Sequence, residues 1–420
     1  MHRIEIKNFG PIKKVEMDIT KMCFLLGELA SGKSTIAKLV YFFRSAQDEF
    51  VTITANSFDA WLSCYRAYLS LLNSKFTNIF GATMKLGTSE ITYYYSPDSQ
   101  MKITPSVDNK VNINISKTMM EHLKEIWTNS KPDTPNSKIN GLETVTRRGV
   151  YNVFHDEYYS LYIPAGRALL SRQMLLRVIL SREANLINGQ VLDYRPFDVV
   201  DAPTRKYMVE VEDARIWFAT PKTYGEKDRF LISTSEKILK GTYSLNNDYD
   251  YIKLQNQQLV PLSYSSSGQQ EVIWLLNILH YYAFMGRKCF VVIEEPEAHL
   301  HPDAQYLLVQ YVAAFSNITG SEVLITTHSP YILTSCNNLF FAEKCARGIT
   351  DDGAVSSIIA KDCWVNADDA SAYIMENASV KDIMDKKLAM VEIAELDKVA
   401  SEQDDEYEAL VRLLRGGATE

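Results

Sequence analysis

The sequence lacks the features that mark disulfide-rich, zinc-binding and membrane proteins. Its six cysteines are scattered and contain no Cys-x-x-Cys pair, which argues against a disulfide framework or a zinc site. No stretch approaches the roughly 20 apolar residues that a membrane-spanning helix needs. The first residues lack the apolar core of a signal peptide. We therefore expect a cytoplasmic protein without a membrane segment.

The sequence also lacks an excess of positive charge, internal repeats and long heptad arrays. The 44 Lys and Arg residues are outnumbered by 52 Asp and Glu residues, so the formal net charge is −8. Nucleic acid is therefore not indicated by charge, although a local basic groove could still bind it. Without heptads, coiled-coil arms are not expected. The length of 420 residues instead favours two lobes, or one domain with a large insertion.

A glycine-rich segment near the N-terminus is the most informative feature that is present. Residues Gly27–Thr35 fit the P-loop pattern, between an apolar run at 23–26 and helical spacing at 35–41. Backbone N–H groups of such a loop converge on phosphate oxygens at a helix N-terminus. Lys33 would reach the β and γ phosphates of ATP, and the Ser34 hydroxyl would ligate Mg²⁺. The predicted phosphate-binding residues are Gly27, Ser31, Gly32, Lys33, Ser34 and Thr35.

Two later apolar runs end in polar residues that could complete this site. Residues 288–293 end in Glu294 and Glu295, at the carboxyl end of a predicted buried strand. We expect Glu294 to join the Mg²⁺ shell and Glu295 to polarise the water that attacks the γ phosphate. The run at 322–327 ends in His328, which could sense the γ phosphate or simply precede a Pro-started helix.

A Ser- and Gly-rich turn precedes both of these strands. Residues 262–270 lead into a strongly apolar predicted helix at 271–284. Such a turn can bind an anion, but ordinary helix capping explains it equally well. His299 and His301 could suggest zinc, yet no third ligand follows at a suitable spacing.

Taken in this order, these motifs resemble the ABC-type ATPase heads of the SMC, RecF and OLD group, over residues 1–45 and 255–335. The segments 6–12 and 293–302 are most similar to the OLD-type branch. Residues 265–269 stand where that group has its Leu-Ser-Gly-Gly-Gln signature. The chain departs from the common pattern at two places: at Glu294, where many relatives have Asp, and at 28–30, where Pro-Asn-Gly is common. Both departures affect the expected rate of ATP hydrolysis more than the binding of ATP. The matching signature residues are Ser266, Gly268 and Gln269.

The resemblance implies a fold and a division of the chain. The fold is an α/β P-loop NTPase of ABC-head type, with a mixed sheet, an antiparallel β subdomain and a helical second lobe. We expect residues 168–184 to be helical, and residues from Val380 onward as well. The expected parts are an N-terminal part of the ATPase core at 1–116, an inserted mainly helical lobe at 117–255, a C-terminal part of the core at 256–345, and a partly helical tail at 346–420 that could dock a partner.

The resemblance further implies an ATPase in which the signature of one subunit completes the nucleotide site of another. The partner would be a second head, in a homodimer or a higher homo-oligomer. No metal cluster of a Toprim nuclease is evident after His328, so a separate effector protein, which could be a nuclease, is expected. This arrangement is similar to that of anti-phage ATPase subunits such as AriA of PARIS or PtuA of Septu. Two alternatives are a RecF-like DNA-repair ATPase that binds DNA across engaged heads, and a nucleotide-binding scaffold with low turnover.

Overall fold

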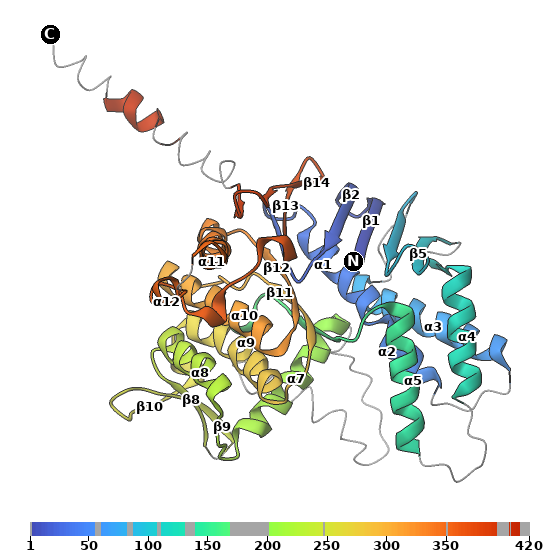
Figure 1. Cartoon of the computed structure of the whole chain (residues 1–420), viewed down its shortest axis with the longest axis horizontal. Coiled ribbons are helices and arrows are strands. Elements are labelled where there is room, and N and C mark those ends of the chain that lie inside the picture. Colours follow the sequence, from blue (N-terminus) through green and yellow to red (C-terminus); the bar gives the residue numbers. More distant parts are fainter. Residues whose placement is uncertain are drawn as a thin grey trace, which may run out of the picture.

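The chain folds around one large mixed β-sheet that is covered by helices on both faces (Figure 1). The structure is a computed structural model. It describes residues 2–54, 60–81, 87–106, 111–130, 139–168, 201–246, 248–349, 352–392, 403 and 405–411. Within these residues the main sheet has 11 strands in the order β6-β5-β4-β1-β2-β14-β13-β3-β12-β11-β7. The predicted α/β class with a mixed sheet is confirmed.

Parallel strands form the part of the sheet that carries the predicted motifs. Strand β3 leads into the P-loop and lies between β12 and β13, and β11 lies between β12 and β7. All five strands run parallel, so their carboxyl ends meet at one edge of the sheet. Their bounds are Met22–Gly27 (β3), Tyr159–Ile163 (β7), Cys289–Glu294 (β11), Glu322–Thr327 (β12) and Ala370–Glu376 (β13).

Antiparallel strands continue the same sheet on the other side of β13. Buried and exposed residues alternate in β1 and β2, as expected for strands with only one face against a core. The expected short strands between 90 and 116 are confirmed as β4 to β6. The bounds are His2–Phe9 (β1), Ile12–Ile19 (β2), Glu90–Tyr94 (β4), Gln100–Pro105 (β5), Val111–Ile115 (β6) and Ser379–Asp382 (β14). Two smaller sheets contain Thr242–Asn246 (β8), Tyr249–Lys253 (β9) and Leu259–Pro261 (β10), and Met384–Asp385 (β15) and Met390–Val391 (β16).

The central strands are apolar because each of their faces contributes to a separate core. Along β3, Cys23 and Leu25 pack with α1 to α5, whereas Phe24 and Leu26 pack with α7 to α11. The first set of helices is Lys33–Arg44 (α1), Ala46–Thr54 (α2), Trp61–Phe80 (α3), Lys117–Asn129 (α4) and Ile139–Phe154 (α5). The second set is Ala202–Phe218 (α7), Glu226–Leu239 (α8), Ser267–Phe284 (α9), Pro302–Thr319 (α10) and Pro330–Gly348 (α11), and a short helix α12 spans Gly353–Ser356. None of the described helices is long and apolar enough to span a membrane.

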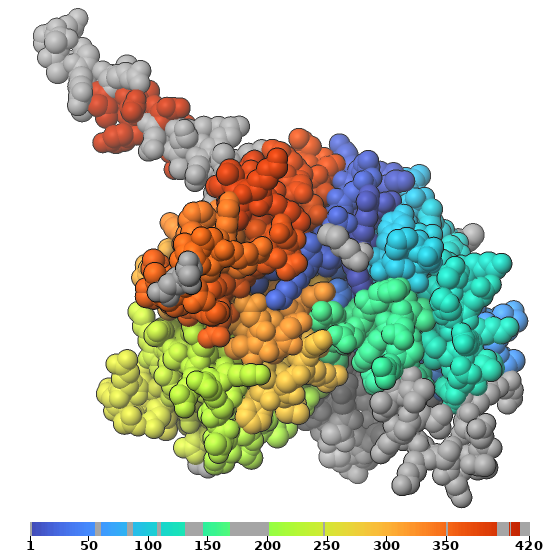
Figure 2. All heavy atoms as spheres, in the orientation of Figure 1, coloured from blue at the N-terminus to red at the C-terminus, as the bar shows by residue number. Residues whose placement is uncertain are grey.

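The described part of the region after residue 345 contains strands as well as helix. The helix expected from Val380 onward is wrong at 380–391, where β14, β15 and β16 form instead. Strand β13 pairs with β3, and β14 pairs with both β13 and β2. Figure 2 shows these late residues, in red, beside the blue N-terminal segment. The middle of the main sheet therefore depends on pairing between distant parts of the sequence.

The boundaries of the four expected parts stay a prediction. Strand β7, inside the expected inserted lobe, pairs in parallel with β11 of the core sheet. Of the helix expected at 168–184, only residue 168 is described.

Candidate nucleotide-binding site

The P-loop has the backbone geometry that its sequence requires. The φ angles of Gly27, Ala30 and Gly32 are 145°, 60° and 106°, in the region that favours glycine. A Cβ atom on Gly27 would lie 2.6 Å from the Cβ of Met375 in β13, so no larger residue fits there. Among the described residues, no side chain caps the first turn of α1. The backbone N–H groups of that turn suit an anion.

The Lys33 ammonium is turned back onto the loop. Its Nζ donates hydrogen bonds to the carbonyl oxygens of Gly27 and Glu28, at 2.8 and 2.7 Å. Burial lowers the pKa of Lys33, and the nearby charges of Glu295, Glu297 and Glu294 oppose this shift. The phosphates of a nucleotide would compete with the two carbonyl groups for this ammonium.

Glu294 is a buried carboxylate at the end of β11. Its residue is 6% exposed, and its Oε1 atom has no hydrogen-bond partner among the described residues. An isolated buried carboxylate oxygen is costly unless a cation or a hydrogen-bond donor offsets it. The exposed Ser34 hydroxyl group lies in the first turn of α1. This donor set fits Mg²⁺, which prefers oxygen ligands and keeps several waters.

Glu295 and His328 meet where β11 and β12 end. The Oε1 atom of Glu295 lies 3.3 Å from Nε2 of His328, and both side chains are about one-third exposed. Glu295 has a φ of 43°, and its N–H donates to the Thr326 carbonyl at 2.9 Å. The structure thus brings together the carboxylate and the imidazole that the sequence predicts for this edge.

Two residues at this edge were missed by the sequence reasoning. The Oε1 atom of Glu297 accepts hydrogen bonds from the Thr327 hydroxyl, at 2.7 Å, and from the His328 N–H, at 2.8 Å. The sequence feature that could have indicated Glu297 is its position two residues after Glu295. Arg167, just after β7, donates to the carbonyl oxygens of Glu294 and Glu295. No local pattern indicates this contact, because the partners are far apart in the sequence.

The Ser- and Gly-rich turn caps α9. The Ser266 hydroxyl oxygen accepts from the Gln269 N–H at 3.3 Å, and Gln269 Oε1 accepts from the Ser266 N–H at 3.0 Å. These reciprocal bonds form a capping box, so ordinary capping is part of its role. A Cβ atom on Gly268 would lie 2.6 Å from the His299 carbonyl oxygen. The turn therefore fits tightly against the segment that follows the two glutamates.

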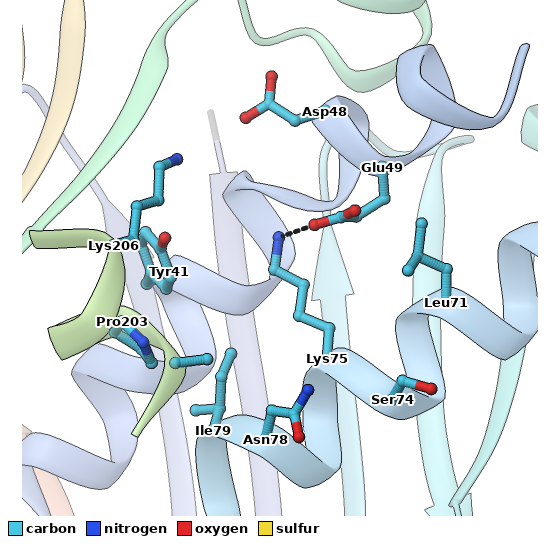
Figure 3. A pocket seen from close by; sticks show the side chains of 11 residues that line it. Tyr41, Asp48, Glu49, Leu71, Ser74, Lys75, Asn78, Ile79, Pro203 and Lys206 are labelled. Carbon is cyan, nitrogen blue, oxygen red and sulfur yellow. Dashed lines mark hydrogen bonds and ion pairs between the residues drawn. The ribbon is translucent and has the colours of Figure 1, made fainter. Parts of the chain in front are cut away.

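A separate cavity lies between α1, α2, α3 and α7 (Figure 3). It measures about 270 Å³, and none of its lining residues belongs to the P-loop or to the strand ends. Its side chains carry both signs of charge, and Lys75 already donates to Glu49 at 2.6 Å. We assign no part of the nucleotide site to it.

Comparisons with known proteins place the chain in a family. A family model of an AAA ATPase domain matches residues 1–187 and 219–333. A search of curated proteins gives no match. Among solved structures, the chain is similar to an SMC head bound to the C-winged helix domain of ScpA, with 12% identity, coverage of 91% of this chain and 96% of that chain, and a TM-score of 0.42. It is also similar to an SMC head with an extended coiled coil, bound to the C-terminal domain of ScpA and derived from Pyrococcus furiosus, with 12% identity, 96% and 100% coverage and a TM-score of 0.41. An SMC head from Thermotoga maritima matches with 10% identity, 91% and 98% coverage and a TM-score of 0.37. Because the family model covers most of the sequence, the chain belongs to the AAA ATPase domain family.

Proposed function

We propose that the chain binds Mg-ATP at the P-loop and hydrolyses it to ADP and phosphate. The observation that carries this proposal is the meeting of Glu295 and His328 at the ends of β11 and β12, beside the loop that begins at the end of β3. Membership of the AAA ATPase domain family supports nucleotide binding.

Each residue of the edge has a distinct role in this proposal. Lys33 and the loop N–H groups bind the phosphates. Ser34 and Glu294 hold Mg²⁺, which offsets the negative charge of the phosphates when it is bound. Glu295 orients the attacking water and accepts its proton, and His328 donates a hydrogen bond to the γ phosphate. The remaining loop contacts come from Gly27, Ser31, Gly32 and Thr35.

We infer that two heads engage around ATP, with Ser266, Gly268 and Gln269 of one head completing the site of the other. Exposure of the first part of the signature turn supports this role: Ser266 is exposed, and Tyr264, two residues before it, is 83% exposed, whereas Gly268 is buried. Engagement would then control a separate effector, as in the anti-phage ATPases that the sequence resembles.

Phosphate release and ATP binding by three proteins test the catalytic assignment. Wild type should hydrolyse ATP with Mg²⁺. Lys33→Ala should bind ATP at least tenfold more weakly, because it loses a charge-assisted contact worth about 1.5–3 kcal/mol. Glu295→Gln should bind normally but turn over about 100-fold more slowly, in line with the loss of a general base. Equal ATP affinity in Lys33→Ala would overturn the P-loop assignment, and unchanged turnover in Glu295→Gln would favour the scaffold alternative.

Mixing two inactive variants tests whether a site is shared between heads. Ser266→Ala and Lys33→Ala should each have low turnover alone. A mixed dimer would contain one site with both native residues, so the mixture should regain activity. If the mixture is no more active than its components, the signature does not act in trans.

A further inference from the structure

Arg167 is a buried arginine whose hydrogen bonds converge on the end of β11, at Glu294 and Glu295. It follows Gly166, which has a φ of 71°, and the residue is only 1% exposed. Its Nη1 donates to the carbonyl oxygens of Pro164 and Glu294, at 2.8 and 2.7 Å. Its Nη2 donates to the carbonyl oxygen of Glu295 at 3.0 Å. One guanidinium group therefore joins the ends of β7 and β11.

The same guanidinium also contacts α9, through Glu271. Its Nε donates to the Glu271 carbonyl oxygen at 3.1 Å and lies 3.6 Å from the Glu271 carboxylate. The Oε2 atom of that carboxylate has no hydrogen-bond partner among the described residues. An arginine that served mainly as half of a buried ion pair would form a close fork with the carboxylate. Here the short bonds go to backbone carbonyl oxygens, which indicates that Arg167 fixes the backbone.

The backbone that Arg167 holds has a demanding conformation. Glu295 is not glycine, yet its φ of 43° lies in the left-handed region, which costs energy and needs support from its surroundings. The support comes from both sides of the residue. Its N–H donates to Thr326 in β12, and its carbonyl oxygen accepts from Arg167. The direction of the Glu295 side chain toward His328 depends on this conformation.

We propose that Arg167 is a positioning residue for Glu295, and that it holds the Glu295 backbone in the left-handed conformation that hydrolysis requires. The inference rests on the proposed role of Glu295 in hydrolysis. Lysine cannot replace arginine here, because one ammonium group cannot present donors in the planar, divergent directions of a guanidinium. ATP binding through the P-loop does not involve Arg167 and should stay intact.

Arg167→Lys tests this proposal against a matched variant. We expect kcat for ATP to fall about 10- to 100-fold, as for small displacements of a catalytic group, while the Kd for ATP changes less than about twofold. The control is Arg44→Lys, a second arginine that is 1% exposed and is paired with Asp156 and Glu322. It lies at the opposite end of β12, so it should lower stability but leave kcat of the folded protein unchanged. Equal kcat losses in both variants would overturn the positioning role.

A double-mutant cycle separates positioning of Glu295 from other effects. In the Glu295→Gln background, Arg167→Lys should cause no further loss of turnover, because the group that it positions is gone. A full additional loss there would contradict the proposal. If Arg167→Lys does not fold, Arg167→Gln combined with Glu271→Gln removes both buried charges together and should show the same kcat loss. Normal turnover in that variant would also contradict it, whereas an inactive wild type would instead refute the proposed hydrolysis.

Discussion

At the residue scale, a close backbone contact and a capping box explain why the turn at the start of α9 contains glycine, serine and glutamine. Gly268 faces the His299 carbonyl oxygen in the segment that links Glu295 to α10. No side-chain carbon fits in that space, so the glycine lets α9 begin directly against this segment. Ser266 and Gln269 then hold the first turn of α9 through their capping box. The Ser- and Gly-rich turn thus has a packing role that is independent of any nucleotide.

Gly268→Ala tests this packing role. The added methyl group would lie 2.6 Å from the carbonyl oxygen, so we expect the free energy of unfolding to fall by about 1–3 kcal/mol, as for overpacked cores. Denaturant unfolding followed by circular dichroism measures it. Gly348→Ala is the control, because among the described residues its Cβ atom would meet no heavy atom within 4 Å outside its own helix and its chain neighbours, and it should change stability by less than about 0.5 kcal/mol. Equal stabilities of the two variants would refute the close contact.

His280 makes stability depend on pH. It is buried beside Trp217, Phe218 and Tyr224, and burial lowers its pKa from 6.5 to about 4, although Asp228 opposes the shift. Below pH 6.5 the unfolded chain takes up a proton that the folded protein refuses until about pH 4. Stability is therefore full above pH 6.5 and falls as pH decreases through this window.

His280→Phe should remove this contribution while it preserves the aromatic contacts. Between pH 7 and pH 5, wild type should lose about 2 kcal/mol more of its unfolding free energy than the variant, from the usual 1.36 kcal/mol per pKa unit. Urea unfolding at the two pH values gives the comparison. The same pH dependence in both proteins would show that His280 is not buried in its neutral form.

At the element scale, strands with local motifs could be predicted and strands without them could not. The apolar runs of β3, β11 and β12 end in P-loop, glutamate and histidine residues, so sequence alone placed them correctly. Strand β13 begins with Ala370, Ser371 and Ala372, which have no strong strand signal. Its partner β3 lies far away in the sequence. Contacts of this kind, including those of Arg167, depend on the tertiary fold.

Two truncations test the structural role of β13. A chain that ends at residue 392 retains every strand of the described sheets, and we expect its melting temperature to stay close to that of the full chain. A chain that ends at residue 345 lacks β13 and leaves the β3 edge of the parallel strands unpaired. It should show no cooperative thermal unfolding. Wild-type melting of the shorter chain would show that β13 is dispensable.

At the scale of the whole molecule, the sheet separates two cores and gathers at one edge the groups for which we propose a role in hydrolysis. One face of β3 and β11 packs with one set of helices, and the other face packs with the second set. The carboxyl ends of the same strands provide the P-loop, Glu294, Glu295 and His328. Because the signature turn packs against its own chain after β11, a second molecule is the natural source of a signature for each P-loop in the proposed account.

The most direct test of this account is native mass spectrometry of Glu295→Gln protein with and without Mg-ATP. Without nucleotide we expect a single head. With Mg-ATP, the slow variant should accumulate a dimer that holds two ATP molecules, and Lys33→Ala should abolish it. Binding of ATP to a head that stays monomeric would contradict the proposed engagement of heads. The absence of any bound nucleotide would contradict the nucleotide site itself.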